Sequence, residues 1–272
     1  MTQKKSRLLK YEGCWQTKIG GMLLGQQQVL VRGRDLFSEL DEFSWQQFLL
    51  FAVTGREFTS EVVMFLERLL ALCINYPDPR IWNNRVAALA GTVGSTATLA
   101  NSAAIAATEA KIFGGQSNLT ASQFIHEALI KVQAGEDLEF IVRTELEKNR
   151  AVAGYGRPVL DKDERIEHAQ RLMQEFAIVQ GDHCRLAYQV ERILASGRWH
   201  YQMNINGLMA AVTADLGISA KEYYLWLVNG YSAGIIACYI DAESKQEGAL
   251  FPLRCERINY TGASYRDWHR RT

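Results

Sequence analysis

Residues 154–158 read GYGRP, and this turn separates the two intervals of sequence that decide the fold class. The chain has only four prolines, and none lies between Pro79 and Pro158 or between Pro158 and Pro252. Proline breaks the interior of a helix, so both intervals leave room for long uninterrupted helices. We therefore predict an all-α protein.

Local patterns predict where the helices and strands lie. Apolar side chains recur at helical spacing in residues 62–70 and 166–176. Strand-like alternation is confined to residues 15–31 and predicts a short N-terminal β-hairpin around Gly20, Gly21 and Gly25. Three capping boxes predict helix starts: Ser44 with Gln47, Thr120 with Gln123, and Ser219 with Glu222.

Residues 86–108 carry no charge, and their 23 residues are enough to span a bilayer. They consist largely of alanine, glycine, serine and threonine, and lack the large apolar residues that drive membrane insertion. Small side chains let helices approach closely, so we predict buried helices at the centre of the domain and no membrane span. A dimer interface would use the same composition.

Composition excludes several classes of partner. Thirty Lys and Arg residues balance thirty Asp and Glu residues, which argues against a nucleic-acid partner. Five histidines and five cysteines occur without metal-ligand spacing, so we predict no metal site, buried thiols and a reducing compartment. The polar N-terminus predicts no secretory signal and a cytoplasmic location.

The GYGRP turn suggests a site for an anion. Gly154 and Gly156 can expose backbone amides beside Arg157, which is always charged. Arg165 and Arg254 are two further guanidinium groups that could converge with Arg157 on carboxylates. The alternative is a tight turn between helices with a solvated arginine. The sequence contains no GxxxxGK(S/T) motif for a nucleoside triphosphate. Residues 154–156 also lack the third glycine of the dinucleotide motif GxGxxG.

Together these segments resemble the citrate synthase superfamily, which includes the 2-methylcitrate synthases and the citryl-CoA lyase module of ATP-citrate lyase. The matching pieces run in family order from residue 31 to residue 262. They are VRGRDL (31–36), LFAVTG (50–55), NRVAALAG (84–91), FGG (113–115), GYGRPV (154–159), DER (163–165), NINGL (204–208) and LRCERINYTG (253–262). FGG is similar to both the "LHGGAN" of synthases and the "RFGGA" of the lyase module.

The resemblance implies a two-lobed helical homodimer that binds an acyl-CoA thioester and a small carboxylate in the cleft between its lobes. Residues 1–114 and 216–272 would form the large domain, and residues 115–215 the small domain. Coenzyme A would contact the turn at Gly154, Tyr155 and Gly156. The carboxylate substrate would contact three further residues: Phe113, Arg165 and Arg254.

Three acid/base positions of the family differ in this sequence. Asn206 stands where the family has its aspartate base, and its amide is no base near neutral pH. Phe113 and Arg157 stand at the two histidine positions, and an arginine binds carboxylates or oxyanions but is a poor proton shuttle. Replacement bases are available, although nothing in the sequence selects one: Asp78, Asp161, Asp163, Tyr155 and His200.

Two functional hypotheses follow. The first is a divergent enzyme, a citrate synthase-like acyltransferase or citryl-CoA lyase-like enzyme, that forms or cleaves a carbon–carbon bond next to a CoA thioester. In it Arg157 and Asn206 have catalytic roles. The second is a catalytically inactive homologue that binds CoA or a carboxylate and has a regulatory role.

Overall fold

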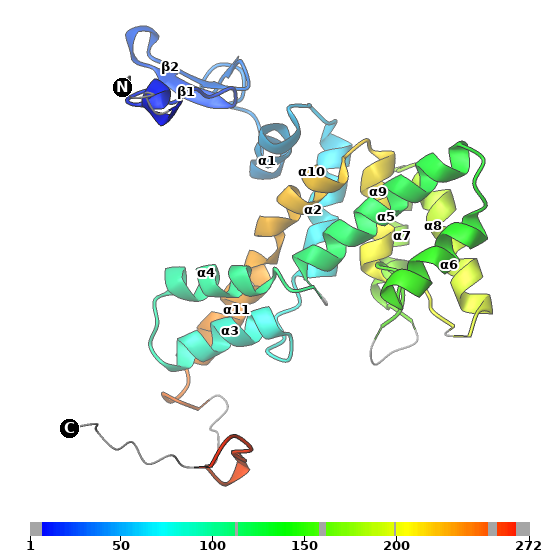
Figure 1. Cartoon of the computed structure of the whole chain (residues 1–272). Helices are drawn as coiled ribbons and strands as arrows, with labels where there is room; N and C mark the ends of the chain where they lie inside the picture. The colour runs from blue at the N-terminus through cyan, green and yellow to red at the C-terminus, as the bar shows by residue number, and fades with distance from the viewer. Residues whose placement is uncertain (1–6, 112–113, 158–161, 199, 250–254, 265–272) are drawn as a thin grey trace, which may run out of the picture.

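The computed structural model describes residues 7–111, 114–157, 162–198, 200–249 and 255–264. Helices dominate, and the one small sheet lies at the N-terminal end, as Figure 1 shows. The α-helices are α1 (Trp45–Thr54), α2 (Ser60–Ile74), α3 (Trp82–Thr92), α4 (Ala97–Ala107), α5 (Gly115–Gln133), α6 (Leu138–Asn149), α7 (Arg165–Glu175), α8 (Asp182–Ser196), α9 (Ile205–Asp215), α10 (Ala220–Leu227) and α11 (Ser232–Glu243). The predicted all-α fold is confirmed.

The N-terminal hairpin is also confirmed, with one strand more than predicted. Strands β1 (Gly20–Leu23), β2 (Gln28–Val31) and β3 (Arg34–Asp35) form an antiparallel sheet in that order. Gly20 lies in β1 opposite Val31, and not in the turn. The turn falls later, at η2 (Leu24–Gln26). The hairpin projects from the helical body (Figure 1).

Two of the three predicted helix starts are correct. Ser44 accepts a hydrogen bond from the Gln47 amide at 3.2 Å, and Ser219 forms a full capping box with Glu222. The start predicted at Thr120 is wrong, because α5 begins five residues earlier, at Gly115. A close approach of backbone segments fixes that earlier start, since a Cβ at residue 114 would lie only 2.3 Å from the carbonyl oxygen of Thr108.

Helix α9 lies at the centre of the main hydrophobic core. All of its residues from Gly207 to Ala214 are buried, and α5, α7, α8 and α10 pack around it. Trp226 and Tyr223 of α10 and Phe65 of α2 are the largest fully buried side chains of this core. The core therefore joins α2 and α10 to α5–α9, across both boundaries predicted between a large and a small domain.

Helices α3, α4 and α11 form a separate layer, which lies below the main core in Figure 1. A Cβ at Gly91 would lie 2.8 Å from the Tyr239 carbonyl oxygen, so the small residue permits the close packing of α3 on α11. The central position predicted for residues 86–108 is wrong. Val93 and Leu99 are 71% and 64% exposed, because no described part of the chain covers one face of this layer.

No described helix combines the length and the apolar character needed to cross a membrane.

Helix capping offers a direct test of these assignments. Ser219→Ala should lower the free energy of unfolding by about 1 kcal/mol, because it removes the side-chain acceptor at the start of α10. Thr120→Ala is the matched control, since Thr120 lies inside α5, where its hydroxyl donates to the Gln116 carbonyl. Alanine is at least as good a helix former there, so chemical denaturation should show no loss of stability. Equal losses in both variants would contradict the helix boundaries.

Candidate functional site

A cavity of about 250 Å³ lies where four helices begin. It is lined by the first residues of α3, α5, α7 and α9, together with the end of α2 and Tyr231 of η3 (Val228–Tyr231). The lining residues are Cys73, Ile74, Tyr76, Ile81, Trp82, Asn83, Asn84, Thr108, Gly114, Asn118, Gly156, Arg157, Arg165, Asn204, Asn206 and Tyr231. Helix N-termini carry partial positive charge, so this arrangement favours an anionic ligand.

The GYGR turn forms one wall of the cavity through a backbone crossing. Gly154 and Gly156 have φ angles of 91° and 81°, in the left-handed region that favours glycine. The chain crosses the start of α9 so closely that a Cβ at Gly207 would lie 2.4 Å from the carbonyl oxygen of Gly154. The Gly156 amide donates to the Gln202 carbonyl at 2.7 Å and is therefore used by the fold.

Tyr155 points away from the cavity. Its ring is buried, and its hydroxyl donates to the Ala187 carbonyl at 2.9 Å. Burial raises the pKa of Tyr155 well above its usual value, with a smaller contribution from Glu191. Of the residues predicted to contact coenzyme A, only Gly156 lines the cavity. Tyr155 is also unsuited to serve as a replacement base.

Arg165 is held in a buried ion pair. Its Nε and Nη2 donate to both oxygens of Asp163, at 2.8 and 2.7 Å, and its Nη1 donates to the Cys73 carbonyl at the end of α2, at 2.9 Å. The same carboxylate accepts the Ile205 amide at 2.9 Å, at the start of α9. Burial alone would raise the pKa of Asp163, but these hydrogen bonds and the guanidinium charge outweigh it, and the pKa lies below its usual value.

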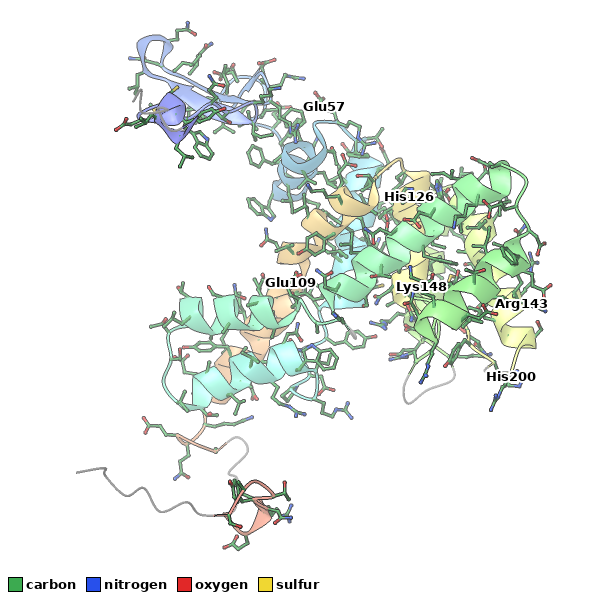
Figure 2. The ribbon with its side chains drawn as sticks, in the orientation of Figure 1. Glu57, Glu109, His126, Arg143, Lys148 and His200 are labelled. Atoms are coloured by element: carbon green, nitrogen blue, oxygen red, sulfur yellow. The ribbon has the colours of Figure 1, made fainter. Side chains whose placement is uncertain are left out.

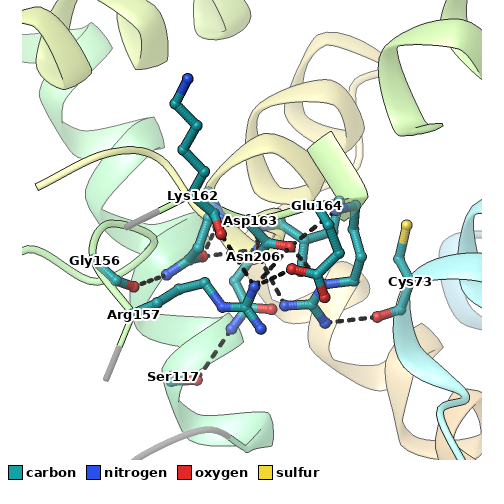
Figure 3. A network of polar contacts seen from close by, with 12 residues as sticks. Cys73, Ser117, Gly156, Arg157, Lys162, Asp163, Glu164 and Asn206 are labelled. Atoms are coloured by element: carbon teal, nitrogen blue, oxygen red, sulfur yellow. Dashed lines mark hydrogen bonds and ion pairs between the residues drawn. The ribbon is translucent and has the colours of Figure 1, made fainter. Parts of the chain in front are cut away.

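Arg157 lies beside this pair and also lines the cavity. Its Nη1 contacts the carboxylate of Glu164, donates to the Lys162 carbonyl at 3.3 Å and lies 3.6 Å from Asp163 (Figure 3). Within the part of the chain that the structure describes, the Nε and Nη2 of Arg157 make no hydrogen bond. These two donors are therefore available to a ligand.

Asn206 completes this side of the cavity. Its Nδ2 donates to the hydroxyl of Ser117 at 3.4 Å, as Figure 3 shows. Asn204 accepts the amides of Asn206 and Gly207 and so caps α9. The structure thus brings together four of the predicted site residues, Gly156, Arg157, Arg165 and Asn206. Phe113 and Arg254 lie outside the described residues.

A second polar group, which the sequence did not reveal, also lines the cavity. Asn118 of α5 is buried and donates to the Tyr231 hydroxyl at 2.6 Å, while its Oδ1 has no hydrogen-bond partner among the described residues. Burial raises the pKa of Tyr231 to about 12. Asn83 and Asn84, in the first turn of α3, are buried beside them. The signal in the sequence was polar asparagines at the starts of otherwise apolar helices.

None of the remaining candidate bases that the structure describes lines the cavity. Asp78 is paired with exposed Arg80 at 2.6 Å. His200 lies beyond the end of α8, where its Nδ1 is 2.8 Å from the Ala195 carbonyl, and Figure 2 shows it at the outer edge of the molecule. Asp163 forms an ion pair with Arg165, and Asp161 lies outside the described residues. Across those residues, no three His, Cys, Asp or Glu side chains cluster in a way that would hold a metal ion.

Solved structures with the same fold are known. The chain superposes on citryl-CoA lyase of Hydrogenobacter thermophilus with a TM-score of 0.79 and 21% identity, over 93% of this chain and 97% of that one. ATP citrate lyase of Methanothrix soehngenii, in complex with citrate and coenzyme A, gives 0.75 and 17%, over 97% of this chain and 45% of its own. Citrate synthase of Thermoplasma acidophilum, in a ternary complex with carboxymethyl coenzyme A and oxaloacetate, gives 0.60 and 17%, over 84% and 59%.

These likenesses define the class as a citrate synthase-like helical fold. The sequence matches the family described as citrate synthase, C-terminal domain, over residues 21–251, and the chain belongs to that family. The superfamily predicted from the sequence is therefore confirmed. A comparison with curated proteins found no match.

The buried ion pair gives a second prediction. Asp163→Asn should lower the free energy of unfolding by about 3–5 kcal/mol, because it leaves the Arg165 charge without its partner. Since the folded-state pKa of Asp163 is lowered, its stabilisation is present at neutral pH and is lost as the pH falls below about 4. The difference in free energy of unfolding between the wild type and the variant should therefore become smaller in acid.

Asp182→Asn is the control, since Asp182 and its partner Arg185 are both 61% exposed. Denaturation at pH 7 should show almost no change for this variant, because exposed ion pairs contribute little. Comparable losses in the two variants would show that Asp163 does not anchor the site.

Proposed function

We propose that this protein is a divergent enzyme that forms or cleaves a carbon–carbon bond next to a CoA thioester. Arg157 and Arg165, with Arg254, hold the carboxylate partner, and Asn206 hydrogen-bonds the thioester or the substrate. The observation that carries the proposal is the position of three residues on one cavity: Arg157 in the glycine turn, Arg165 at the start of α7 and Asn206 at the start of α9.

The structures with the same fold support this choice of ligands. The ATP citrate lyase structure contains citrate and coenzyme A, and the citrate synthase structure contains a CoA analogue with oxaloacetate. We propose that coenzyme A contacts the turn formed by Gly154, Tyr155 and Gly156 at Gly156, which lines the cavity, since the Tyr155 ring lies in the core. Phe113 contributes to the substrate pocket in this proposal, and the cleft lies between a large domain (1–114 and 216–272) and a small one (115–215).

The alternative function is a catalytically inactive homologue that binds CoA or a carboxylate and has a regulatory role. Its support is Asn206, which lines the cavity but has an amide that cannot remove a proton. Each acid/base contribution is worth roughly 10²–10⁴-fold in rate, so the altered positions should slow an ordinary condensation severely. No described carboxylate or histidine lines the cavity as a replacement.

Turnover separates the two functions. The purified chain should be incubated with citryl-CoA, and separately with acetyl-CoA plus oxaloacetate or related keto acids, with product formation followed by mass spectrometry. The enzyme hypothesis predicts a CoA-dependent product and a loss of roughly 10²-fold or more in Arg157→Ala, by analogy with the removal of one oxyanion donor.

The inactive homologue predicts no product with any of these substrates, but a melting temperature that rises with coenzyme A, because ligands that bind only the folded state stabilise it. Activity that is unchanged in Arg157→Ala would remove the role proposed for that arginine. An unchanged melting temperature together with no turnover would exclude both functions.

We also propose that the protein is a homodimer that associates through the open face of α3, α4 and α11. These helices carry a concentration of exposed apolar side chains: Leu89, Val93, Leu99, Ile236 and Ile240. Leu99→Glu should convert the dimer to a monomer in light scattering coupled to size-exclusion chromatography. Ile130→Glu is the control, since Ile130 is 66% exposed on α5, outside this layer. A monomeric wild type, or a dimer that survives Leu99→Glu, would contradict this interface.

A further inference from the structure

The two arginines of the cavity have different acidic partners. Arg165 is paired with Asp163, whose side chain is fully buried and also accepts the Ile205 amide. All three of its guanidinium nitrogens donate to the protein. Arg165 is therefore held in the framework of the site, and two of its five N–H groups, one on Nη1 and one on Nη2, are not used by described residues.

Arg157 and Arg165 are almost equally exposed, at 22% and 21%, but fewer of the nitrogens of Arg157 donate to described residues. Its partner Glu164 is 48% exposed, lies outside the cavity lining, and shares the guanidinium through Nη1 (Figure 3). The Nε and Nη2 of Arg157 remain for a ligand, and side by side they fit one carboxylate in the bidentate manner. Such a carboxylate would share one guanidinium with the carboxylate of Glu164.

The rest of the polar lining is uncharged. Among the described lining residues, the polar groups other than the arginines are amides and hydroxyls, mainly the five asparagines Asn83, Asn84, Asn118, Asn204 and Asn206. Asp163 and Glu164 balance Arg157 and Arg165, so the charges of these four described side chains sum to zero. The buried Oδ1 of Asn118 has no hydrogen-bond partner among the residues that the structure describes, and a ligand hydroxyl or N–H group would satisfy it.

We infer that Glu164 is a specificity-determining residue: its carboxylate limits the negative charge of the ligand that can bind to Arg157. It favours a ligand with one carboxylate and neutral hydrogen-bonding groups over a tricarboxylate. The physical basis is repulsion between like charges, which grows with the charge of the ligand at a fixed distance. The inference rests on the carboxylate-binding role of Arg157 in the proposed function.

The test compares two probes in the full-length chain by isothermal titration calorimetry: citrate, with three carboxylates, and 2-hydroxyisobutyrate, with one carboxylate and a hydroxyl. Glu164→Gln should tighten citrate binding by about fivefold, the affinity equivalent of one exposed ion pair, and 2-hydroxyisobutyrate binding by at most about twofold. Glu167→Gln, an exposed residue one turn further along α7, makes the same change in net charge and should leave both affinities unchanged.

The double variant Glu164→Gln with Arg157→Gln should lose the gain in citrate affinity, since the effect acts through that guanidinium. Equal effects of Glu164→Gln and Glu167→Gln, equal gains for the two probes, a gain that persists without Arg157, or no citrate binding by any variant would each overturn the inference. A purely structural role of the Arg157–Glu164 pair would lower the melting temperature of Glu164→Gln without changing the preference between probes.

Turnover tests the proposed function separately. A Glu164→Gln variant that gains citrate affinity but forms no product with any CoA substrate would contradict the enzyme hypothesis and support the role of Glu164. Product formation by the wild type, with no change in probe preference in Glu164→Gln, would support the enzyme hypothesis and contradict the role of Glu164.

Discussion

The carboxylate of Asp163 is the contact on which the architecture of the site depends. It accepts hydrogen bonds from the Nε and Nη2 of Arg165, whose Nη1 in turn donates to the Cys73 carbonyl near the end of α2. Its second oxygen also holds the Ile205 amide, where α9 begins. One buried side chain therefore fixes the relative positions of α2, α7 and α9. Because an unpaired charge at this position would be strongly unfavourable, the geometry has little freedom to change.

A close crossing of two backbone segments complements this ion pair. The GYGR turn passes over α9 at Gly207, and only glycines at 154 and 207 leave room for the crossing. The Asn204 side chain then bonds the Gly156 carbonyl while it caps α9, so one residue ties the turn to the helix start. The result places Arg157 and Asn206 on the same cavity although they lie about fifty residues apart in the sequence.

Much of the fold could be predicted from the sequence, because its signals are local. Proline spacing and apolar periodicity identified the helices, and alternation identified the hairpin. The errors arose where a distant contact decided the outcome. The capping pattern at Thr120 does not mark the start of α5, because the close approach of Gly114 to the Thr108 carbonyl places that start at Gly115. In residues 86–108 small side chains indicated close packing correctly, but could not show that the packed layer would lie apart from the main core.

The candidate site was predictable only in part, for a related reason. Arginines beside a glycine turn suggest an anion site from the sequence, whereas the partner of each arginine depends on tertiary structure. Asp163 and Glu164 adjoin Arg165 in the sequence, yet Glu164 pairs with Arg157, seven residues away. Asn118 and Tyr231 meet across 113 residues, a contact that no local pattern encodes.

The electrostatics of the site have two contributions, one from ionised side chains and one from backbone dipoles. The ionised side chains described at the site cancel, as do those of the whole chain. The starts of α3, α5, α7 and α9 still direct partial positive charge at the cavity, and they outnumber the ends of α2 and α4 that also line it. Backbone dipoles are fixed by the fold and cannot be neutralised by a rearranged side chain. A modest preference for anions therefore survives the pairing of both arginines. The acidic partners of those arginines then determine how much negative charge a ligand can bring.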